Sequence, residues 1–373
     1  MPYDPRMMKR TNWLIVVGIA LGLLVPAGTA NAAPALARLF LRVSYLRFSA
    51  PTDRPVDLTL FLNDEGVVTL RDDFGRITPG PGCVAVSARE VECDHPAAGN
   101  VDFQGSPFDD LVHVRFAPPR GFSGFGGEGD DQFLGQAGDE RFEGNSGNDE
   151  LRGRRGDDRL TGDDGDDRLF GGSGDDELEP LNFTKSPDGA DEFSGGDGRD
   201  SVRYYAADSV SVSLNDVADD GMIGEHDNVL SDVEDITGTT GDDVLEGDGD
   251  ANFLGGELGS DVLIGGGGDD RLGGRRGDDT LVGGQGNDRL FGGEDHDDLS
   301  GRRGGDKLVG EEGNDSLIGG GGHDDLFGRP GNDHLDTVDD VADRAVCGTG
   351  IDVATVDAKD YVSASCETVN VVA

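Results

Sequence analysis

The sequence is short of basic and aromatic residues. Its 31 lysines and arginines face 76 aspartates and glutamates, which gives a formal net charge of −45. No nucleic acid and no anionic membrane surface is therefore expected as a partner. Aromatic residues make up only 6% of the chain. High charge with few aromatics is usual in disordered chains, unless another feature of the sequence imposes order.

The sequence also lacks the motifs of common secreted hydrolases. Neither a zinc-binding H-E-x-x-H nor a nucleophile elbow G-x-S-x-G occurs. The six histidines are scattered along the chain: His95, His113, His226, His296, His323 and His334. We expect no enzyme. The alternative is a secreted hydrolase or toxin-like enzyme with an unrecognised site in the N-terminal segment or in residues 180–237.

No apolar run reaches the roughly 20 residues that a membrane-spanning helix needs. The run Trp13–Val25 follows three basic residues within Arg6–Arg10 and precedes the small residues Ala30–Ala32. This order is typical of a secretory signal peptide cleaved after about Ala32, and a membrane anchor is the disfavoured alternative. We expect a secreted, extracellular protein without membrane insertion after signal cleavage. Its mature chain contains no tryptophan.

Cysteine is scarce, and the four cysteines form two close pairs in sequence. An exported chain meets an oxidising compartment, in which such pairs form disulfides. We expect the local pairing Cys83–Cys93 and Cys347–Cys366 among the three possible connectivities. A metal–thiolate site is the alternative, but neither pair has the C-x-x-C spacing usual in zinc sites.

Glycine and aspartate are abundant, and they recur with a period of nine residues. Six units run without a break from Gly126 to Glu179, eleven more run from Gly238 to Asp336, and a weaker copy occupies residues 195–203. Position eight is Phe, Leu or Val throughout, and position six is Asp except at Glu140 and Asn252. So strict a period indicates a solenoid. A flexible acidic linker does not explain the apolar residue at position eight.

The unit GGQGNDRLF at residues 283–291 illustrates the use of each position. Its last three residues form a short strand that directs Leu290 inward. Glycines at positions one, two and four permit positive φ and let backbone carbonyls crowd around one site. Calcium takes roughly six to eight oxygen ligands from carboxylates and carbonyls. A turn with several free carbonyls and one aspartate, here Asp288, supplies about half of such a shell.

The pattern G-G-x-G-x-D followed by x, an aliphatic residue and x resembles the calcium-binding nonapeptide repeat of RTX proteins. The resemblance implies a parallel β-roll with two units in each coil and Ca²⁺ shared between turns stacked two units apart. Asp288 would then share ions with the turns carrying Asp270 and Asp306. The ligand residues that follow are Asp131, Asp149, Asp158, Asp167, Asp176, Asp200, Asp243, Asp261, Asp270, Asp279, Asp288, Asp297, Asp306, Asp315, Asp324 and Asp333, with Gly265, Gly274, Gly283 and Gly292 as examples of position one.

Stacking also predicts that the fold depends on metal. Coils about 4.8 Å apart bring the position-six carboxylates into columns. Each neighbouring pair then repels by about 1–3 kcal/mol. We expect the rolls to form only when calcium is bound.

These patterns divide the chain into six parts. The expected fold is all-β, with parallel β-roll arrays, a small N-terminal β segment and disulfide-pinned caps. The parts are residues 1–32, a signal peptide; 33–125, a small N-terminal β segment or cap with Cys83–Cys93; 126–179, the first array; 180–237, a β-rich insert with one degenerate repeat; 238–336, the second array; and 337–373, a C-terminal cap with Cys347–Cys366.

Some segments outside the strict register also carry signals. Residues 101–116 look like an eroded first coil, with Asp110 and Leu111 near the ligand and core positions. The acidic loop 219–228 offers further carboxylates for calcium, but no register supports a site there. Arginine pairs such as Arg275-Arg276 indicate either a ridge that contacts an acidic partner or, as we favour, relief of local repulsion.

The expected function is that of a secreted calcium-binding protein with a structural, adhesive or matrix role. Its expected partners are calcium ions and a cell-surface or matrix contact of unknown identity, and a simple calcium buffer is a weaker alternative. Better-known RTX proteins usually carry an uncleaved C-terminal secretion signal. The N-terminal signal of this chain puts a toxin role in doubt and suggests the general secretion route.

Overall fold

The computed structural model describes residues 100–114, 122–180, 189–205, 208–223 and 225–372, together with the backbone of strands β1–β6. Every helix or strand element in this part of the chain is a strand. None of its segments forms a helix long and apolar enough to cross a membrane. Apart from β1, the predicted signal peptide lies outside the described residues, as do the side chains of Cys83 and Cys93.

The chain forms two compact units, Met1–Asp158 and Arg159–Ala373. Two sheets make up the first unit. One contains β1 (Leu14–Val17), β2 (Tyr45–Ser49), β7 (Asn100–Gln104), β9 (Phe122–Glu128) and β11 (Arg141–Ser146). The other contains β5 (Cys83–Ala85), β6 (Glu90–Asp94), β4 (Val67–Asp72), β3 (Asp57–Leu62), β8 (Leu111–Val114), β10 (Gln132–Leu134) and β12 (Glu150–Arg155).

The N-terminal segment has the antiparallel pairing that its alternating sequence predicts. Strand β4 pairs antiparallel with both β3 and β6, and β5 pairs antiparallel with β6. The last pairing sets the backbone of Cys83 opposite that of Cys93. Parallel pairing begins where β2 meets β7 and β3 meets β8, so these strands extend the sheets of the first array.

Three groups of paired strands make up the second unit. The first contains β13 (Arg159–Asp164), β15 (Glu177–Glu179), β17 (Ser201–Arg203), β21 (Asp235–Thr237), β23 (Phe253–Leu258), β25 (Arg271–Arg276), β27 (Arg289–Glu294), β29 (Lys307–Glu312), β31 (Asp325–Pro330), β33 (Arg344–Thr349) and β35 (Tyr361–Val362). The second contains β14 (Arg168–Ser173), β16 (Glu192–Asp197) and β20 (Asn228–Val229). The third contains β19 (Gly221–Met222), β18 (Val210–Ser213), β22 (Val244–Glu246), β24 (Val262–Gly267), β26 (Thr280–Gln285), β28 (Asp298–Arg303), β30 (Ser316–Gly321), β32 (His334–Asp336), β34 (Val353–Val356) and β36 (Thr368–Val371).

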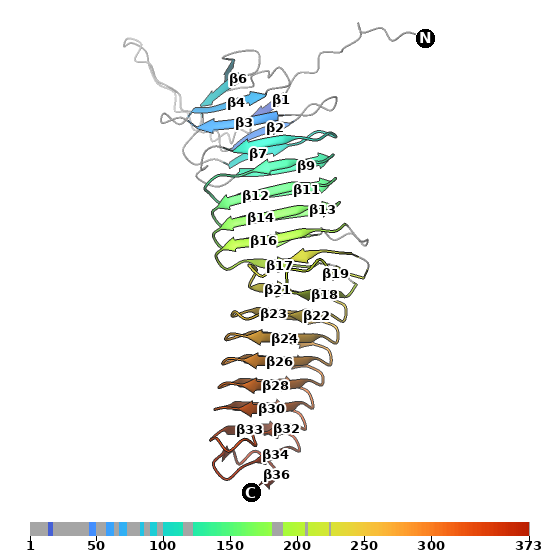
Figure 1. Cartoon of the computed structure of the whole chain (residues 1–373), viewed down its shortest axis with the longest axis vertical. Coiled ribbons are helices and arrows are strands. Elements are labelled where there is room, and N and C mark those ends of the chain that lie inside the picture. Colours follow the sequence, from blue (N-terminus) through green and yellow to red (C-terminus); the bar gives the residue numbers. More distant parts are fainter. Residues whose placement is uncertain are drawn as a thin grey trace, which may run out of the picture. The chain divides into compact units, whose positions relative to one another are not determined.

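Two units of the repeat make one coil, as the resemblance to RTX repeats implies. Leu263 of β24 pairs in parallel with Leu281 of β26, and Leu272 of β25 pairs with Leu290 of β27. Strands of successive coils therefore lie directly above one another, with β24, β26, β28 and β30 in one stack (Figure 1). The fold is the predicted parallel β-roll.

The apolar residue at position eight forms the core. The position-eight leucines of the second array, from Leu245 to Leu335, expose 0–1% of their surface. In the first unit Phe133 and Phe142 take this place beside Leu151, and the rings of Phe103 and Phe133 pack edge-on with centroids 5.9 Å apart. Gly124 makes room for this packing, because a Cβ there would overlap the Phe133 ring.

The first coil places its core residue one position later than the sequence suggested. Val112 is fully buried, whereas Leu111 is only half-buried. Asp110 occupies position six, because its backbone N–H donates to Asp131 Oδ1 at 2.6 Å. The core position itself is therefore Val112, next to Leu111, since the core residue lies two places after the aspartate, on the same side of the strand.

The C-terminal segment closes the roll with one more irregular coil. Cys347 takes position one of a unit in which Gly348, Gly350 and Asp352 keep their usual places. Its sulfur is bonded to that of Cys366 at 2.06 Å, which confirms the predicted bridge. The bridge ties β33 to the segment between β35 and β36.

Candidate metal-binding turns

Each turn holds its aspartate by hydrogen bonds to the neighbouring coils. Asp288 Oδ1 accepts the backbone N–H of Asp270 at 2.9 Å, and the N–H of Asp288 donates to Asp306 Oδ1 at 2.7 Å. The turns carrying Asp270 and Asp306 thus lie directly on either side of Asp288. These are the two turns that the resemblance to RTX repeats paired with it.

The second carboxylate oxygen of these aspartates has no donor. Asp270, Asp288 and Asp306 expose no more than 2% of their surface, and each has an Oδ2 atom that is buried without a hydrogen-bond partner. Other aspartates likewise have a buried Oδ2 atom without a hydrogen-bond partner: Asp131, Asp200, Asp261, Asp279, Asp297, Asp315, Asp324, Asp333, Asp343 and Asp352. A buried carboxylate oxygen without a hydrogen-bond partner is costly. A column of such oxygens in register therefore indicates a site for cations.

In the regular repeats position one is glycine, because the aspartate of the same turn folds back over it. A Cβ at Gly283 would overlap Asp288 Oδ2, and one at Gly274 would overlap Asp279 Oδ2. Gly265 and Gly292 stand in the same relation to Asp270 and Asp297. At Gly265 the added Cβ would also meet the carbonyl oxygen of Gly283, 2.7 Å away. These glycines thus keep open a space bordered by a carboxylate and a carbonyl.

Backbone carbonyls from positions two and four line the same edge. The carbonyl oxygen of Gly266 lies against Gly284, and that of Gly268 lies against Gly286. Both Gly284 and Gly286 have positive φ, of 119° and 138°, which glycine adopts without strain. Successive turns therefore present their carbonyls in rows beside the column of carboxylates.

Burial makes these carboxylates hard to ionise in the absence of metal. It raises the pKa of Asp297 to about 8 and the pKa values of Asp270 and Asp306 to about 7. The carboxylates one coil away add to this rise, and the backbone hydrogen bond opposes it. A bound divalent cation would reverse the balance by favouring the ionised form.

All predicted aspartates occupy position six of a turn and expose no more than 2% of their surface. In the first unit the backbone N–H of Asp131 donates to Asp149 Oδ1, and that of Glu140 donates to Asp158 Oδ1. In the second unit one column is Asp270, Asp288, Asp306 and Asp324, and the other is Asp243, Asp261, Asp279, Asp297, Asp315 and Asp333. The backbone N–H of Asp167 donates to Asp191 Oδ1, and that of Asp176 donates to Asp200 Oδ1.

Asp243 differs from the other members of its column. Its Oδ2 accepts the backbone N–H of Thr239 at 2.6 Å, and its Oδ1 accepts that of Val210 at 2.8 Å. The Thr239 hydroxyl adds a third hydrogen bond. Both carboxylate oxygens of Asp243 are therefore engaged by the protein itself.

The predicted ligand residues left out several position-six residues. The backbone N–H groups of Asp167, Asp191, Asp200 and Asp333 donate to Asp191, Asp227, Glu234 and Asp352, respectively. Each acceptor lies two residues before a buried apolar residue: Phe193, Val229, Ile236 and Ala354. A search for an acidic residue followed at +2 by an apolar one would have found them without the glycines.

Position five, a variable position of the repeat, has a structural task of its own. Asp269 Oδ1 accepts the backbone N–H of Asn287 at 2.7 Å, and Asn287 Oδ1 accepts that of Gly305 at 3.0 Å. The hydrogen bonds donated by Asn287 lower the pKa of the Asp269 carboxyl. Asp or Asn at position five thus links exposed turns of neighbouring coils.

The acidic loop of the insert uses its carboxylates internally. Asp220 accepts the N–H groups of Ser213 and Val229 at 2.7 and 2.9 Å. Asp227 accepts the N–H of Asp191 at 3.0 Å and the hydroxyl of Tyr204 at 3.2 Å. These two carboxylates therefore serve as hydrogen-bond acceptors that hold the insert together.

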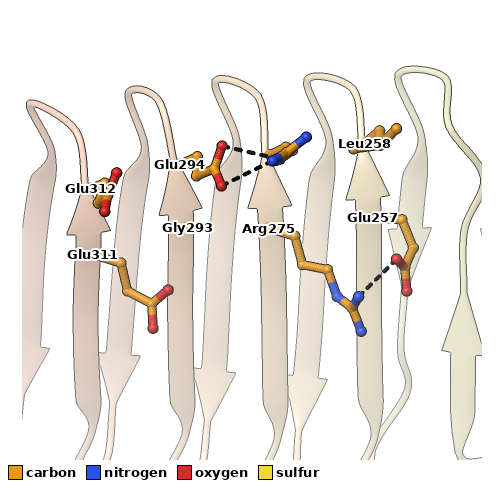
Figure 2. Close-up of a pocket in the computed structure, with 8 residues that line it drawn as sticks. Glu257, Leu258, Arg275, Gly293, Glu294, Glu311 and Glu312 are labelled. Carbon is orange, nitrogen blue, oxygen red and sulfur yellow. Dashed lines mark hydrogen bonds and ion pairs between the residues drawn. The ribbon is translucent and has the colours of Figure 1, made fainter.

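Arginines at positions two and three form ion pairs along one ridge. Arg275 contacts Glu257 at 2.9 Å, and Arg276 contacts Glu294 at 3.0 Å, each across one coil (Figure 2). These contacts support the view that arginine pairs relieve repulsion on the turns.

Calcium fits the donors of the regular turns. The described ranges contain no group of three or more His, Cys, Asp or Glu side chains in metal-binding geometry. Each turn instead offers one carboxylate oxygen together with carbonyl oxygens of two coils, which are hard oxygen donors suited to Ca²⁺ and unsuited to softer metals.

Comparison with known proteins identifies the repeats. A family model for four copies of the RTX calcium-binding nonapeptide repeat matches residues 125–151, 143–178, 231–263, 264–299, 273–308 and 300–335. No curated protein matches the chain. Residues 125–178 and 231–335 are therefore RTX calcium-binding nonapeptide repeats.

Proposed function

We propose that the protein is exported, folds its rolls on binding calcium and serves outside the cell as a structural or adhesive module. This is a binding function and not an enzymatic one. Export is supported by the basic, apolar and small residues of segment 1–32, which have the order of a signal peptide. The exported chain would meet the millimolar calcium that weak extracellular sites require.

The observation that carries the proposal is the columns of buried Oδ2 atoms without donors. Without a cation, folding must bury each carboxylate and bring it close to the carboxylates of neighbouring coils. Both terms oppose folding, as the raised pKa values of Asp131, Asp297 and Asp306 indicate. Calcium removes both the cost of burial and the repulsion, because it coordinates the unpaired Oδ2 atoms and neutralises the neighbouring carboxylates.

A calcium titration tests this mechanism. The chain without residues 1–32 is treated with chelator, and its far-ultraviolet circular dichroism is followed as calcium is added. We expect a cooperative gain of β-structure at about 0.1–1 mM calcium. Magnesium at the same concentration should have little effect, because it demands octahedral geometry and holds its water. A spectrum already folded in chelator would overturn the mechanism.

A further inference from the structure

One outward face of the second array is basic, although the chain carries a net charge of −45. Position seven places Arg271, Arg289 and Lys307 on the adjacent strands β25, β27 and β29, directly opposite one another. Asp325 on β31 and Arg344 on β33 continue the row. All five side chains are exposed.

The repeat itself does not require this row. On the other sheet of the same array, position seven holds Val262, Thr280, Asp298 and Ser316 on β24 to β30. Both sheets share the same coils, turns and acidic surroundings. A general need to offset negative charge would place cations on both faces, and it does not explain why only one has them.

The cations have few carboxylates near them: the charge of Arg289 helps to lower the pKa of the Asp269 carboxyl, and Asp325 lies opposite Lys307 on the next strand. Among the described residues, no ion pair involves Arg271, Arg289 or Lys307. Several other arginines are paired: Arg159 on the same sheet contacts Glu177 and Glu179 at 2.8 and 2.6 Å, and Arg275 contacts Glu257 (Figure 2). Like charges directly opposite on neighbouring strands are destabilising, so this unpaired row has a cost that the paired arginines avoid.

Half-buried phenylalanines fix the positions of most of the cations. Arg271 lies over the rings of Phe253 and Phe291, at 5.9 and 5.3 Å from their centroids. Lys307 and Arg344 lie over the ring of Phe327, at 5.7 and 5.2 Å. Such cation–π contacts hold the charged groups in place without neutralising them. They also cover the ring faces.

We propose that this basic face, formed by Arg271, Arg289, Lys307 and Arg344 over Phe253, Phe291 and Phe327, binds a linear acidic polysaccharide with one carboxylate on each sugar. Arg271, Arg289 and Lys307 repeat along the roll at the strand spacing of about 4.8 Å, close to the length of one sugar, before Asp325 interrupts the row. The covered rings offer no platform for the base stacking that binds single-stranded nucleic acid. Half-buried rings also present too little apolar surface to insert into a membrane.

The proposal goes beyond calcium binding, because it concerns side chains that the metal turns do not use. The test uses the calcium-loaded chain without residues 1–32 and short oligomers of polygalacturonate, with affinity measured by calorimetry at low and physiological salt. The triple variant Arg271→Gln/Arg289→Gln/Lys307→Gln should bind about tenfold more weakly, since three exposed charge contacts are lost. The affinity of the unmodified chain should fall with added salt.

A matched control removes the same charge elsewhere. The variant Arg155→Gln/Arg302→Gln/Arg303→Gln changes exposed turn arginines and should bind as the unmodified chain does. The single variant Arg289→Gln, at a position without a ring contact among the described residues, tests the face with least risk to folding, and binding should weaken about twofold.

Three results would overturn the proposal: no binding by the unmodified chain, equal weakening in both triple variants, or equal competition by single-stranded DNA or anionic vesicles. Circular dichroism of the same samples reports calcium-dependent folding separately. A failure of the basic face is thereby distinguished from a failure of metal-dependent folding.

Discussion

The insert and the regular coils of the second array use buried carboxylates in opposite ways. In the insert, Asp220 and Asp227 accept hydrogen bonds on both oxygens, from backbone N–H groups and from Tyr204. In the regular coils, Asp279 and Asp297 use one oxygen and leave the other buried without a donor. Both kinds of aspartate lie at the edge of the same roll.

The difference teaches that an acidic residue in the repeat register is not by itself a metal ligand. What separates the two classes is whether the protein supplies a donor to the second oxygen. Asp243 lies where the insert meets the second array and keeps the repeat sequence. It nevertheless belongs with the insert, because the backbone N–H groups of Thr239 and Val210 donate to its two carboxylate oxygens. Regular coils should therefore need calcium, and residues 208–237 of the insert should not.

Removal of calcium should produce the largest contrast between these regions. Amide hydrogen exchange in residues 256–336 should accelerate about a thousandfold or more in chelator, because coils that need the cation open. Residues 208–237 should keep more of their protection. Mass spectrometry of peptic fragments measures both regions in one sample, and equal loss of protection would contradict the division.

Substitution of one turn glycine should have the next largest effect. In Gly283→Ala the new Cβ would overlap Asp288 Oδ2, which displaces the carboxylate and costs about 1–3 kcal/mol of unfolding free energy. The control is Gly273→Ala, where a Cβ has no atom within 4 Å. Thermal unfolding in calcium should show a lower midpoint for the first variant alone, and a loss in both would point to backbone effects instead.

Asp297→Asn and Asp243→Asn should separate metal binding from hydrogen bonding. At Asp297 the amide keeps the one acceptor that is used, so no backbone hydrogen bond is lost while calcium stoichiometry falls. Asn252 already shows that an amide fits at position six. At Asp243 one of two backbone donors loses its acceptor, which costs about 1–3 kcal/mol with no change in stoichiometry. Equilibrium dialysis and denaturant unfolding measure the two quantities, and a stoichiometry that falls equally in both variants would remove the distinction.

Low pH should partly restore the β-structure that is lost without calcium, and this is the smallest of the expected effects. The folded pKa values of about 7 for Asp270 and about 8 for Asp297 lie above about 3.9, the value in an unfolded chain. Between these limits the folded state binds more protons, so its stability in chelator falls as pH rises. The metal-free chain should show more β-structure at pH 5 than at pH 8. In calcium the dependence reverses, because protons compete for the same oxygens, and a metal-free spectrum that does not change with pH would count against buried carboxylates as the obstacle to folding.

The sequence predicted the repetitive part of the molecule well, because position six and position eight follow from one short pattern. Asp288 and Leu290 lie in the structure as their spacing requires. The irregular coils were harder to predict. From Asp167 to Asp191 the coil spans 24 residues in place of the usual 18, so a search by glycine spacing loses the register.

Other features depend on side-chain geometry that no spacing reveals. The satisfaction of Asp243 by Thr239 depends on which way one carboxylate turns. Phe133 fills the core beside Gly124 because a ring occupies the space that a second side chain would need. The basic face became visible only when the 18-residue coil placed Arg271, Arg289 and Lys307 on one sheet.

The coil length also constrains how such a chain can grow. Duplicating 18 residues adds one coil and leaves every later side chain on its original sheet. Duplicating a single nonapeptide would preserve every turn and every core leucine, yet it would move all later residues to the opposite face. Arg289 and Lys307 would then part from Arg271. A protein that recognises something with one face can therefore lengthen its metal-binding stack only by even numbers of repeats.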